Sequence, residues 1–107
     1  MSGVPDRPSN TQTGTSYTLV LADAFKFIEM SNAAASTLTV PPNSAVAFPI
    51  GTVIEGVQLG AGQVTLTPGS GVTINAAPGR KVAAQYGVFG IRKSATDTWV
   101  AYGRLAA

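Results

Sequence analysis

The chain has 107 residues and a mass of 10.9 kDa, with 45% hydrophobic residues, 11% charged residues and a formal net charge of +2. It contains no cysteine and no histidine, which excludes disulfides, thiolate metal sites and histidine-based catalytic triads. The length fits one domain with a single core. Because average soluble domains have about 25% charged residues, the low charge content predicts an oligomer or a part of a larger assembly.

The first segment, residues 1–16, is predicted to be an extended arm. It contains two prolines and the polar run 9–15, and such a composition cannot bury enough apolar surface to offset its ordering entropy. We therefore expect it to lie along a neighbouring subunit. The segment has no apolar core of a signal peptide, and no apolar run of the chain approaches the ~18 residues of a transmembrane helix.

Residues 17–107 are predicted to form one β-rich domain. Residues 17–22 and 25–30 alternate apolar and polar side chains around a turn at Asp23, which predicts a hairpin. Residues 36–40 have strand character again and end at a pair of prolines. The following segment, 45–51, is apolar but broken by Pro49, and we expect it to be a buried crossing between sheets.

The central stretch, residues 52–75, is predicted to be an antiparallel meander. Three alternating runs rich in β-branched residues are separated by glycine-rich turns at 60–62 and 68–71, and glycine supplies the positive φ that short hairpin loops need. The side chains expected on the buried face are those of Val53, Leu59, Val64, Leu66, Val72 and Ile74.

Residues 85–93 and 98–103 are predicted to form a terminal hairpin. Short strands at intervals of roughly 8–12 residues, with turn residues between them, are typical of all-β domains. The predicted fold is therefore an antiparallel β-sandwich or a jelly-roll-like barrel, with the extended N-terminal arm.

Catalytic chemistry is not expected. The acids Asp6, Asp23, Glu29, Glu55 and Asp97 are too few and too scattered to nominate a carboxylate pair or a calcium loop. We expect neither a metal nor another cofactor, and no membrane partner.

The charged residues cluster only in the basic pairs Arg80–Lys81 and Arg92–Lys93. They are predicted to be solvated, because nucleic-acid binding usually requires a basic stripe with groove-reading or aromatic elements. A nucleic-acid partner is therefore not expected.

The aromatic residues Tyr86, Trp99 and Tyr102 leave two readings open. They could stack on a sugar ring, or they could be core and interface aromatics whose polar tips are satisfied, which is the commoner case.

From residue 17 to residue 105 the chain resembles a β-rich module of the virion proteins of tailed bacteriophages. The resemblance is carried by the order of several short pieces of sequence. They are YTLVLADA (17–24), MSNAAA (30–35), LTVPPNS (38–44), FPIGT (48–52), GAGQVT (60–65) and DTW (97–99).

The resemblance implies a structural or adhesive role without catalysis, often in a trimer. One expectation is a capsid decoration, or cement, protein: a homotrimer on the outer surface of the major capsid protein. Val4, Pro5, Arg7 and Pro8 of the arm would then contact the capsid, with Arg7 pairing with a capsid carboxylate. The alternative is a tail fibre or baseplate-associated module that binds a host surface glycan through Tyr86, Trp99 and Tyr102.

Overall fold

The computed structural model describes residues 8–107. These residues form two β-sheets with one short 3-10 helix, so the predicted all-β class is confirmed. Sheet A has the strand order β1-β3-β5-β9-β10-β7, and sheet B has the order β11-β8-β6-β4-β2. The bounds are β1 Ser9–Gln12, β2 Ser16–Thr18, η1 Leu21–Phe25, β3 Phe27–Met30, β4 Ser36–Val40, β5 Val53–Gln58, β6 Val64–Pro68, β7 Thr73–Asn75, β8 Lys81–Val82, β9 Val88–Ala95, β10 Thr98–Gly103 and β11 Leu105–Ala106.

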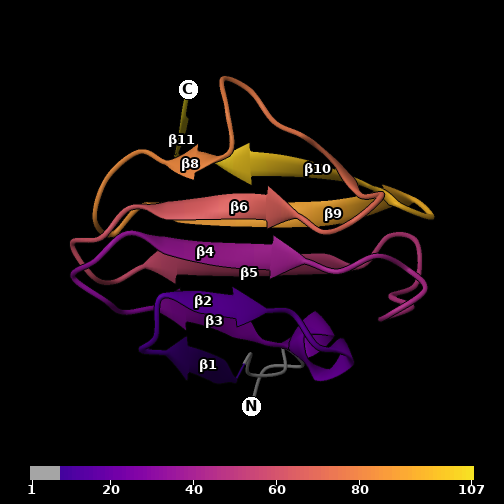
Figure 1. Ribbon diagram of the computed structural model, residues 1–107, viewed down its shortest axis with the longest axis horizontal. Helices are drawn as coiled ribbons and strands as arrows, with labels where there is room; N and C mark the ends of the chain where they lie inside the picture. The colour runs from indigo at the N-terminus through magenta and orange to yellow at the C-terminus, as the bar shows by residue number, and fades with distance from the viewer. Residues whose placement is uncertain (1–7) are drawn as a thin grey trace, which may run out of the picture.

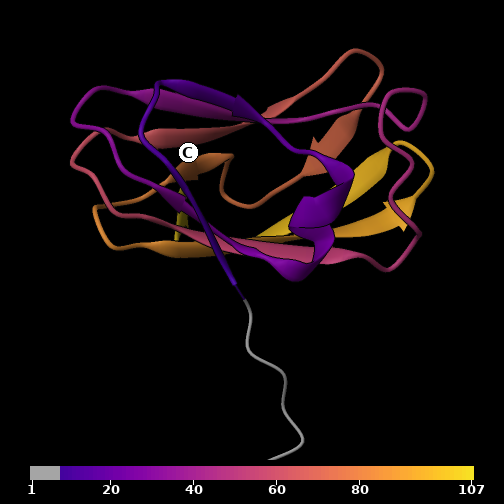
Figure 2. The same ribbon diagram turned by 90° about the horizontal axis from the view of Figure 1, so that it is seen from below.

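Consecutive strands from β1 to β9 alternate between the two sheets. The chain therefore winds around the body, and each new winding lays its strands beside those of the winding before (Figure 1). Seen from below, the two sheets form separate layers with the connections at their ends (Figure 2). In this first part of the chain the neighbouring strands are parallel, as in β1-β3-β5 of sheet A and β2-β4-β6 of sheet B. The strands β8, β9 and β11 then pair antiparallel with their neighbours.

The predicted hairpin at 17–30 and the predicted meander at 52–75 are both wrong. β2 and β3 lie in different sheets, and so do β5 and β6, so neither pair is hydrogen-bonded as neighbours. An alternating pattern identifies a buried face but does not identify the strand that pairs with it. The prediction of a purely antiparallel sandwich is also wrong, because both sheets contain parallel and antiparallel strand pairs.

The glycines at 60–62 have a different role from the hairpin turn that was predicted for them. A Cβ atom on Gly60 would overlap the backbone of Asn32, and one on Gly62 would overlap the backbone of Ala34. The Gly62 N–H also donates to the Asn32 carbonyl at 3.0 Å. These glycines thus permit one connection to lie directly on the connection of the preceding winding, and they do not form a hairpin.

Two other predictions about local structure have clearer outcomes. The terminal hairpin is confirmed, because β9 and β10 pair antiparallel across a short turn. The segment 41–52 does cross from sheet B to sheet A, as expected, but only part of it is buried: Phe48 lies in the core, whereas Pro49 and Ile50 are exposed.

The hydrophobic core lies between the two sheets. The rings of Trp99 and Phe48 pack in a T-shaped arrangement, with their centroids 5.6 Å apart. Val64, Leu66 and Val72 are buried as predicted, but Ile54 is buried on β5 where Val53 was expected, and Leu59 and Ile74 are only half-buried. The core residues are Leu19, Ile28, Met30, Leu38, Val40, Phe48, Ile54, Val64, Leu66, Val72, Val82, Phe89, Ile91, Trp99, Ala101 and Leu105.

Part of the expected N-terminal arm belongs to the folded body. Residues Ser9–Gln12 form β1, an edge strand of sheet A parallel to β3, and Ser16 begins β2 of sheet B. The polar side chains of the segment suit an edge strand, where one flank of the backbone stays free of the ladder. The predicted arm of residues 1–16 is therefore wrong from Ser9 onwards, and its residues 1–7 lie outside the described residues.

Candidate interaction surfaces

An apolar hollow lies at one end of the body, between η1 and the crossing segment 41–52. Its volume is about 460 Å³, and it is lined by Leu21, Ala24, Pro49, Gly51, Thr52 and Val53. Leu21 and Ile50 are exposed by 56% and 64%, and Val20 next to Leu21 is exposed by 48%. Figure 1 shows η1 and the crossing segment at the same end of the strands.

One wall of the hollow is held by the buried carboxylate of Asp23 on η1. Asp23 is fully buried, and it accepts hydrogen bonds from the Tyr17 hydroxyl at 2.7 Å and the Asn10 side-chain amide at 2.8 Å. It also accepts the backbone N–H of Val20 at 2.9 Å, just before the helix. Because three donors from β1, β2 and the helix start converge on one carboxylate, η1 is fixed to both sheets.

The hydroxyl of Tyr17 is held in its protonated form by this arrangement. Burial raises the pKa of Tyr17 to about 12, and the hydrogen bond to Asp23 acts in the same direction. A phenolate beside a carboxylate in a partly buried position would combine desolvation with repulsion between two anions. The neutral hydroxyl therefore donates to Asp23 at physiological pH, while Asn10 donates to the hydroxyl oxygen at 2.9 Å.

The opposite wall is held by a buried cation, Lys93 of β9. Only 2% of Lys93 is exposed. Its ammonium donates to the Asn43 side-chain carbonyl and to the Phe48 backbone carbonyl, both at 2.7 Å. The Gly51 N–H donates to the Lys93 carbonyl at 2.7 Å, and the Lys93 N–H donates to the carbonyl of Thr52 at 2.9 Å.

A second side chain fixes the same crossing segment. The Asp97 carboxylate, in the turn between β9 and β10, accepts the backbone N–H of Asn43 at 2.8 Å. Gly51 has a φ of +94°, a left-handed conformation that side chains larger than glycine rarely adopt. The terminal hairpin is thus hydrogen-bonded to four residues of the crossing segment: Asn43, Phe48, Gly51 and Thr52. The hollow is therefore apolar on its surface and rigidly supported from beneath, which is the arrangement of a preformed binding site.

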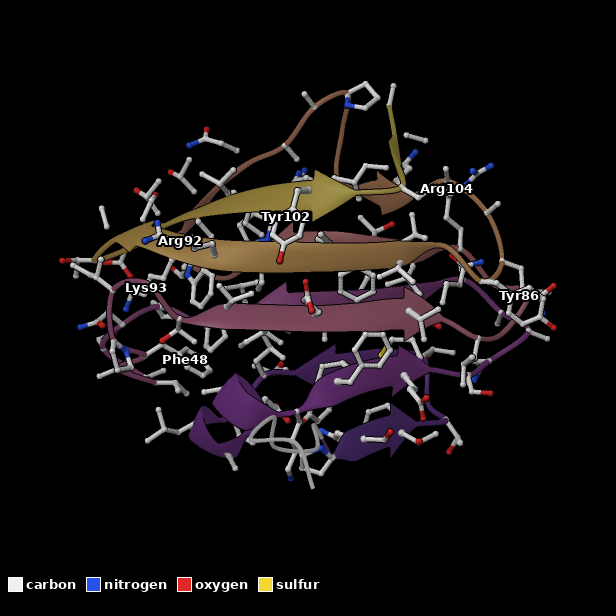
Figure 3. The ribbon with its side chains drawn as sticks, turned by 180° about the vertical axis from the view of Figure 1, so that it is seen from behind. Phe48, Tyr86, Arg92, Lys93, Tyr102 and Arg104 are labelled. Carbon is white, nitrogen blue, oxygen red and sulfur yellow. The ribbon has the colours of Figure 1, made fainter. Side chains whose placement is uncertain are left out.

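A second hollow lies on the outer side of sheet A, next to Tyr102 of β10. It has a volume of about 500 Å³ and is lined by Asn75, Ala76, Ala77, Val100, Ala101, Tyr102 and Gly103. Tyr102 is 42% exposed, and its hydroxyl donates to the Glu55 carboxylate at 2.9 Å. Figure 3 shows Tyr102 near the middle of this face, with Arg92 towards one end of it.

The arm residues predicted to contact a capsid fall mostly outside the described residues. This holds for Val4, Pro5 and Arg7. Pro8 is described and exposed, and its carbonyl accepts the backbone N–H of Phe27 at 2.9 Å. This bond holds the start of the described chain at the first residue of β3, two residues after the end of η1.

The three aromatic residues predicted for glycan stacking do not form one site. Trp99 is 1% exposed and belongs to the core, so it offers no face to a ligand. Tyr86 is 68% exposed with a left-handed φ of 67°, and it lies at one end of the face, away from Tyr102 (Figure 3). Only Tyr102 combines an exposed ring with a hollow.

The predicted solvation of the basic pairs is correct for Arg80, Lys81 and Arg92 but wrong for Lys93. On β9 the side chains alternate, so Arg92 points outwards and Lys93 points between the sheets. Figure 3 shows the two neighbouring residues, with Phe48 near Lys93. Phe89, Ile91 and Lys93 follow one another at every second position of β9, so Lys93 occupies a position on the buried face. This spacing is the sequence signal that could have identified Lys93 as buried.

Within residues 8–107, no three His, Cys, Asp or Glu side chains are grouped so that they could hold a metal ion. The same residues contain no helix that is both long and apolar enough to cross a membrane.

No protein-family model matches the chain, and no curated protein matches it with significance.

Proposed function

We propose that the protein is a structural component of a tailed-bacteriophage virion, and specifically a capsid decoration protein that binds the outer capsid surface and stabilises the shell. The observation that carries this proposal is the apolar hollow, with exposed Leu21 in its lining and exposed Ile50 between its lining residues Pro49 and Gly51. The resemblance of residues 17–105 to virion modules supplies the context. The proposed role involves no catalysis and no cofactor, and its partners are the major capsid protein and further copies of the chain.

The hollow suits a protein partner because its walls are apolar and already fixed. Full burial of a leucine or isoleucine side chain contributes about 1.5–3 kcal/mol, and a rigid site loses little conformational entropy on binding. The contact of a single copy would be modest. Repetition over a capsid lattice would add many such contacts, so weak individual binding would still stabilise the shell.

The arm forms the second part of the proposed contact. Val4, Pro5, Arg7 and Pro8 would lie against the capsid, with Arg7 pairing with a carboxylate of the capsid protein. A deletion that tests this contact has to end at residue 7, because the Pro8 carbonyl accepts the backbone N–H of Phe27 and β1 begins at Ser9. Loss of capsid binding on deletion of residues 1–7, with an unchanged free energy of unfolding, is the expected result.

We propose a homotrimer as the assembly and a β-sandwich as the description of the fold. Three-fold points between capsid hexamers present equivalent patches to a closed trimer. The sandwich description is supported by the antiparallel strands β8 to β11, which follow the parallel windings and complete both sheets. Sedimentation equilibrium of the purified protein tests the trimer, and a monomeric mass would contradict it.

Quantitative mass spectrometry of purified virions tests the proposed location. The expected copy number is close to that of the major capsid protein, or a simple fraction of it set by three-fold sites. A copy number of a few per virion would contradict the decoration role and support the alternative, a tail fibre or baseplate-associated module. Absence from the particle would contradict both.

A pair of substitutions tests the hollow itself. The double variant Leu21→Asp and Ile50→Asp is expected to abolish binding to empty capsids, because two charges would enter the contact. The matched control is Val88→Asp on the outer side of sheet A, where Val88 is 50% exposed. Equal binding by both variants would exclude the hollow as the contact surface.

A further inference from the structure

The outer side of sheet A combines an exposed aromatic ring with an open strand edge. β7 ends at Asn75, which pairs with Val100 of β10. Among the described residues, no strand pairs with β10 on this side beyond Val100. The hollow of about 500 Å³ occupies this place, with Tyr102 on one side and residues 75–77 on the other. Its volume falls within the range of small-molecule sites.

The ring of Tyr102 is held flat against the sheet by Gly90. Tyr102 and Gly90 are direct partners across β10 and β9. A Cβ atom on Gly90 would overlap the end of the tyrosine ring, so the ring occupies the space that any other residue would fill. The hydroxyl then reaches one strand further and donates to Glu55 of β5 at 2.9 Å. An exposed ring fixed at both ends presents its outer face to solvent in one orientation.

Polar groups surround this ring on both sides. Glu55 is half-buried at the hydroxyl end, where a carboxylate can accept hydrogen bonds from additional hydroxyl groups. Asn75 is exposed at the rim of the hollow and offers both donors and an acceptor. Arg92 is exposed on the same side of the sheet. An apolar platform flanked by donors and acceptors matches a sugar ring, which has apolar C–H faces and a rim of hydroxyl groups.

We propose that this surface is a carbohydrate-binding site that takes a neutral hexopyranose unit of a surface polysaccharide. The sugar packs one C–H face on the ring of Tyr102, and its hydroxyl groups hydrogen-bond to Glu55 and Asn75. The site is separate from the apolar hollow at the end of the body. It therefore adds a binding function to the structural role proposed above and does not depend on that role.

The test is a titration of the isotopically labelled protein with defined oligosaccharides, followed by NMR. The probes are maltohexaose, chitohexaose and delipidated O-antigen polysaccharides from several Gram-negative bacteria. Binding of at least one probe, with shifts centred on residues 75–77, 90 and 100–103, is expected. If no probe binds, or if the shifts map elsewhere on the protein, the proposal is wrong.

Three variants separate the platform from a general loss of structure. Tyr102→Ala is expected to weaken binding by on the order of tenfold, since it removes the aromatic platform. Tyr102→Phe retains the ring and is expected to stay within about threefold of the unmodified protein. Gly90→Ala keeps Tyr102 but lifts its ring from the sheet, and it is expected to weaken binding as Tyr102→Ala does.

The matched control is Tyr86→Asn, which removes a more exposed tyrosine at another place and suits its left-handed backbone. It is expected to leave binding unchanged. Each variant is checked by the fluorescence of Trp99, the only tryptophan of the chain. Undiminished binding by folded Tyr102→Ala would overturn the proposal, whatever the copy number in virions proves to be.

Discussion

Asp23 and Lys93 are both buried charged side chains that support the same apolar hollow, but they connect very different stretches of chain. The partners of Asp23 lie 3, 6 and 13 residues away, at the start of η1, in β2 and in β1 respectively. The side-chain partners of Lys93 lie 45 and 50 residues away, in the crossing segment. The carboxylate organises its own neighbourhood, whereas the ammonium joins the terminal hairpin to a segment near the middle of the chain.

The difference shows two ways of fixing an irregular segment. The contacts of Asp23 close short loops, which costs little chain entropy. The contacts of Lys93 close long loops, which are formed only when both sheets are in place. The crossing segment is therefore expected to depend on the complete fold, and η1 is expected to depend on its own network.

The largest expected effect is that of Asp23→Ala. Three donors would lose their acceptor, and each unsatisfied buried donor costs about 1–3 kcal/mol, so a loss of about 3 kcal/mol in the free energy of unfolding is expected. Urea denaturation followed by Trp99 fluorescence measures it. Asp23→Asn keeps the shape and one acceptor oxygen, and it is expected to lose about half as much. A loss below about 1 kcal/mol for Asp23→Ala would show that the network does not hold η1.

Lys93→Met is expected to destabilise the protein by about 2 kcal/mol, because it keeps the apolar stem but leaves the buried carbonyl of Phe48 and the partly buried side-chain carbonyl of Asn43 without their donor. Limited proteolysis should then cut within residues 41–52 before any other place. Arg92→Met is the matched control on the same strand, exposed where Lys93 is buried, and a change within about 0.5 kcal/mol is expected for it. Equal losses for the two variants would contradict the role assigned to Lys93.

The all-β class and the terminal hairpin could be predicted from the sequence because both depend on local signals. Alternation of apolar side chains marks a half-buried strand, and the turn between Ala95 and Thr98 joins two such strands directly. The pairing of the earlier strands could not be predicted in the same way. Their partners lie in the preceding winding, and nothing in the alternation of β5 or β6 distinguishes a hairpin neighbour from a parallel one.

The candidate surfaces were harder to predict for a related reason. The sequence names Tyr102 as one of three aromatic residues that either stack on a sugar or belong to the core or an interface. Its exposed position beside a hollow depends on Gly90 of another strand and on the end of β7, which the local sequence does not show. Trp99 is also aromatic and lies on the same strand as Tyr102. It faces the core because the two residues are three positions apart, and side chains on a strand alternate between its two faces. The apolar hollow joins segments more than 20 residues apart, and no single stretch of sequence contains it.

A smaller effect is expected from Tyr17→Phe, and it depends on pH. The pKa of Tyr17 is raised to about 12 in the folded protein from an ordinary value near 10. The folded state therefore keeps its proton while the unfolded state loses it, and stability that is present below pH 10 is lost as the pH rises towards 12. At neutral pH the variant is expected to lose about 1 kcal/mol, the net value of one hydrogen bond.

Urea denaturation of both proteins from pH 8 to pH 12 measures this dependence. The difference in free energy of unfolding between the two proteins is expected to shrink as the pH rises above 10, because only the original protein carries the Tyr17 ionisation. All other ionisable groups are common to the two proteins and cancel in the difference. A difference that stays constant over this range would contradict the raised pKa of Tyr17.

The smallest expected effect is that of Thr11→Val, which compares an exposed polar contact with a buried one on the same strand. The Thr11 hydroxyl donates to the Glu29 carboxylate at 2.8 Å in an exposed position, whereas Asn10 donates to the buried Asp23. Water replaces the exposed bond, and valine favours a strand as well as threonine does, so a change within about 0.5 kcal/mol is expected. Asn10→Ala, measured by the same denaturation, is expected to cost about 1–2 kcal/mol because the carboxylate loses one buried donor. If the two variants lose the same free energy, burial is not what makes the Asp23 network effective, and the support of η1 has to come from the packing of Leu19 and Ala24 against the core.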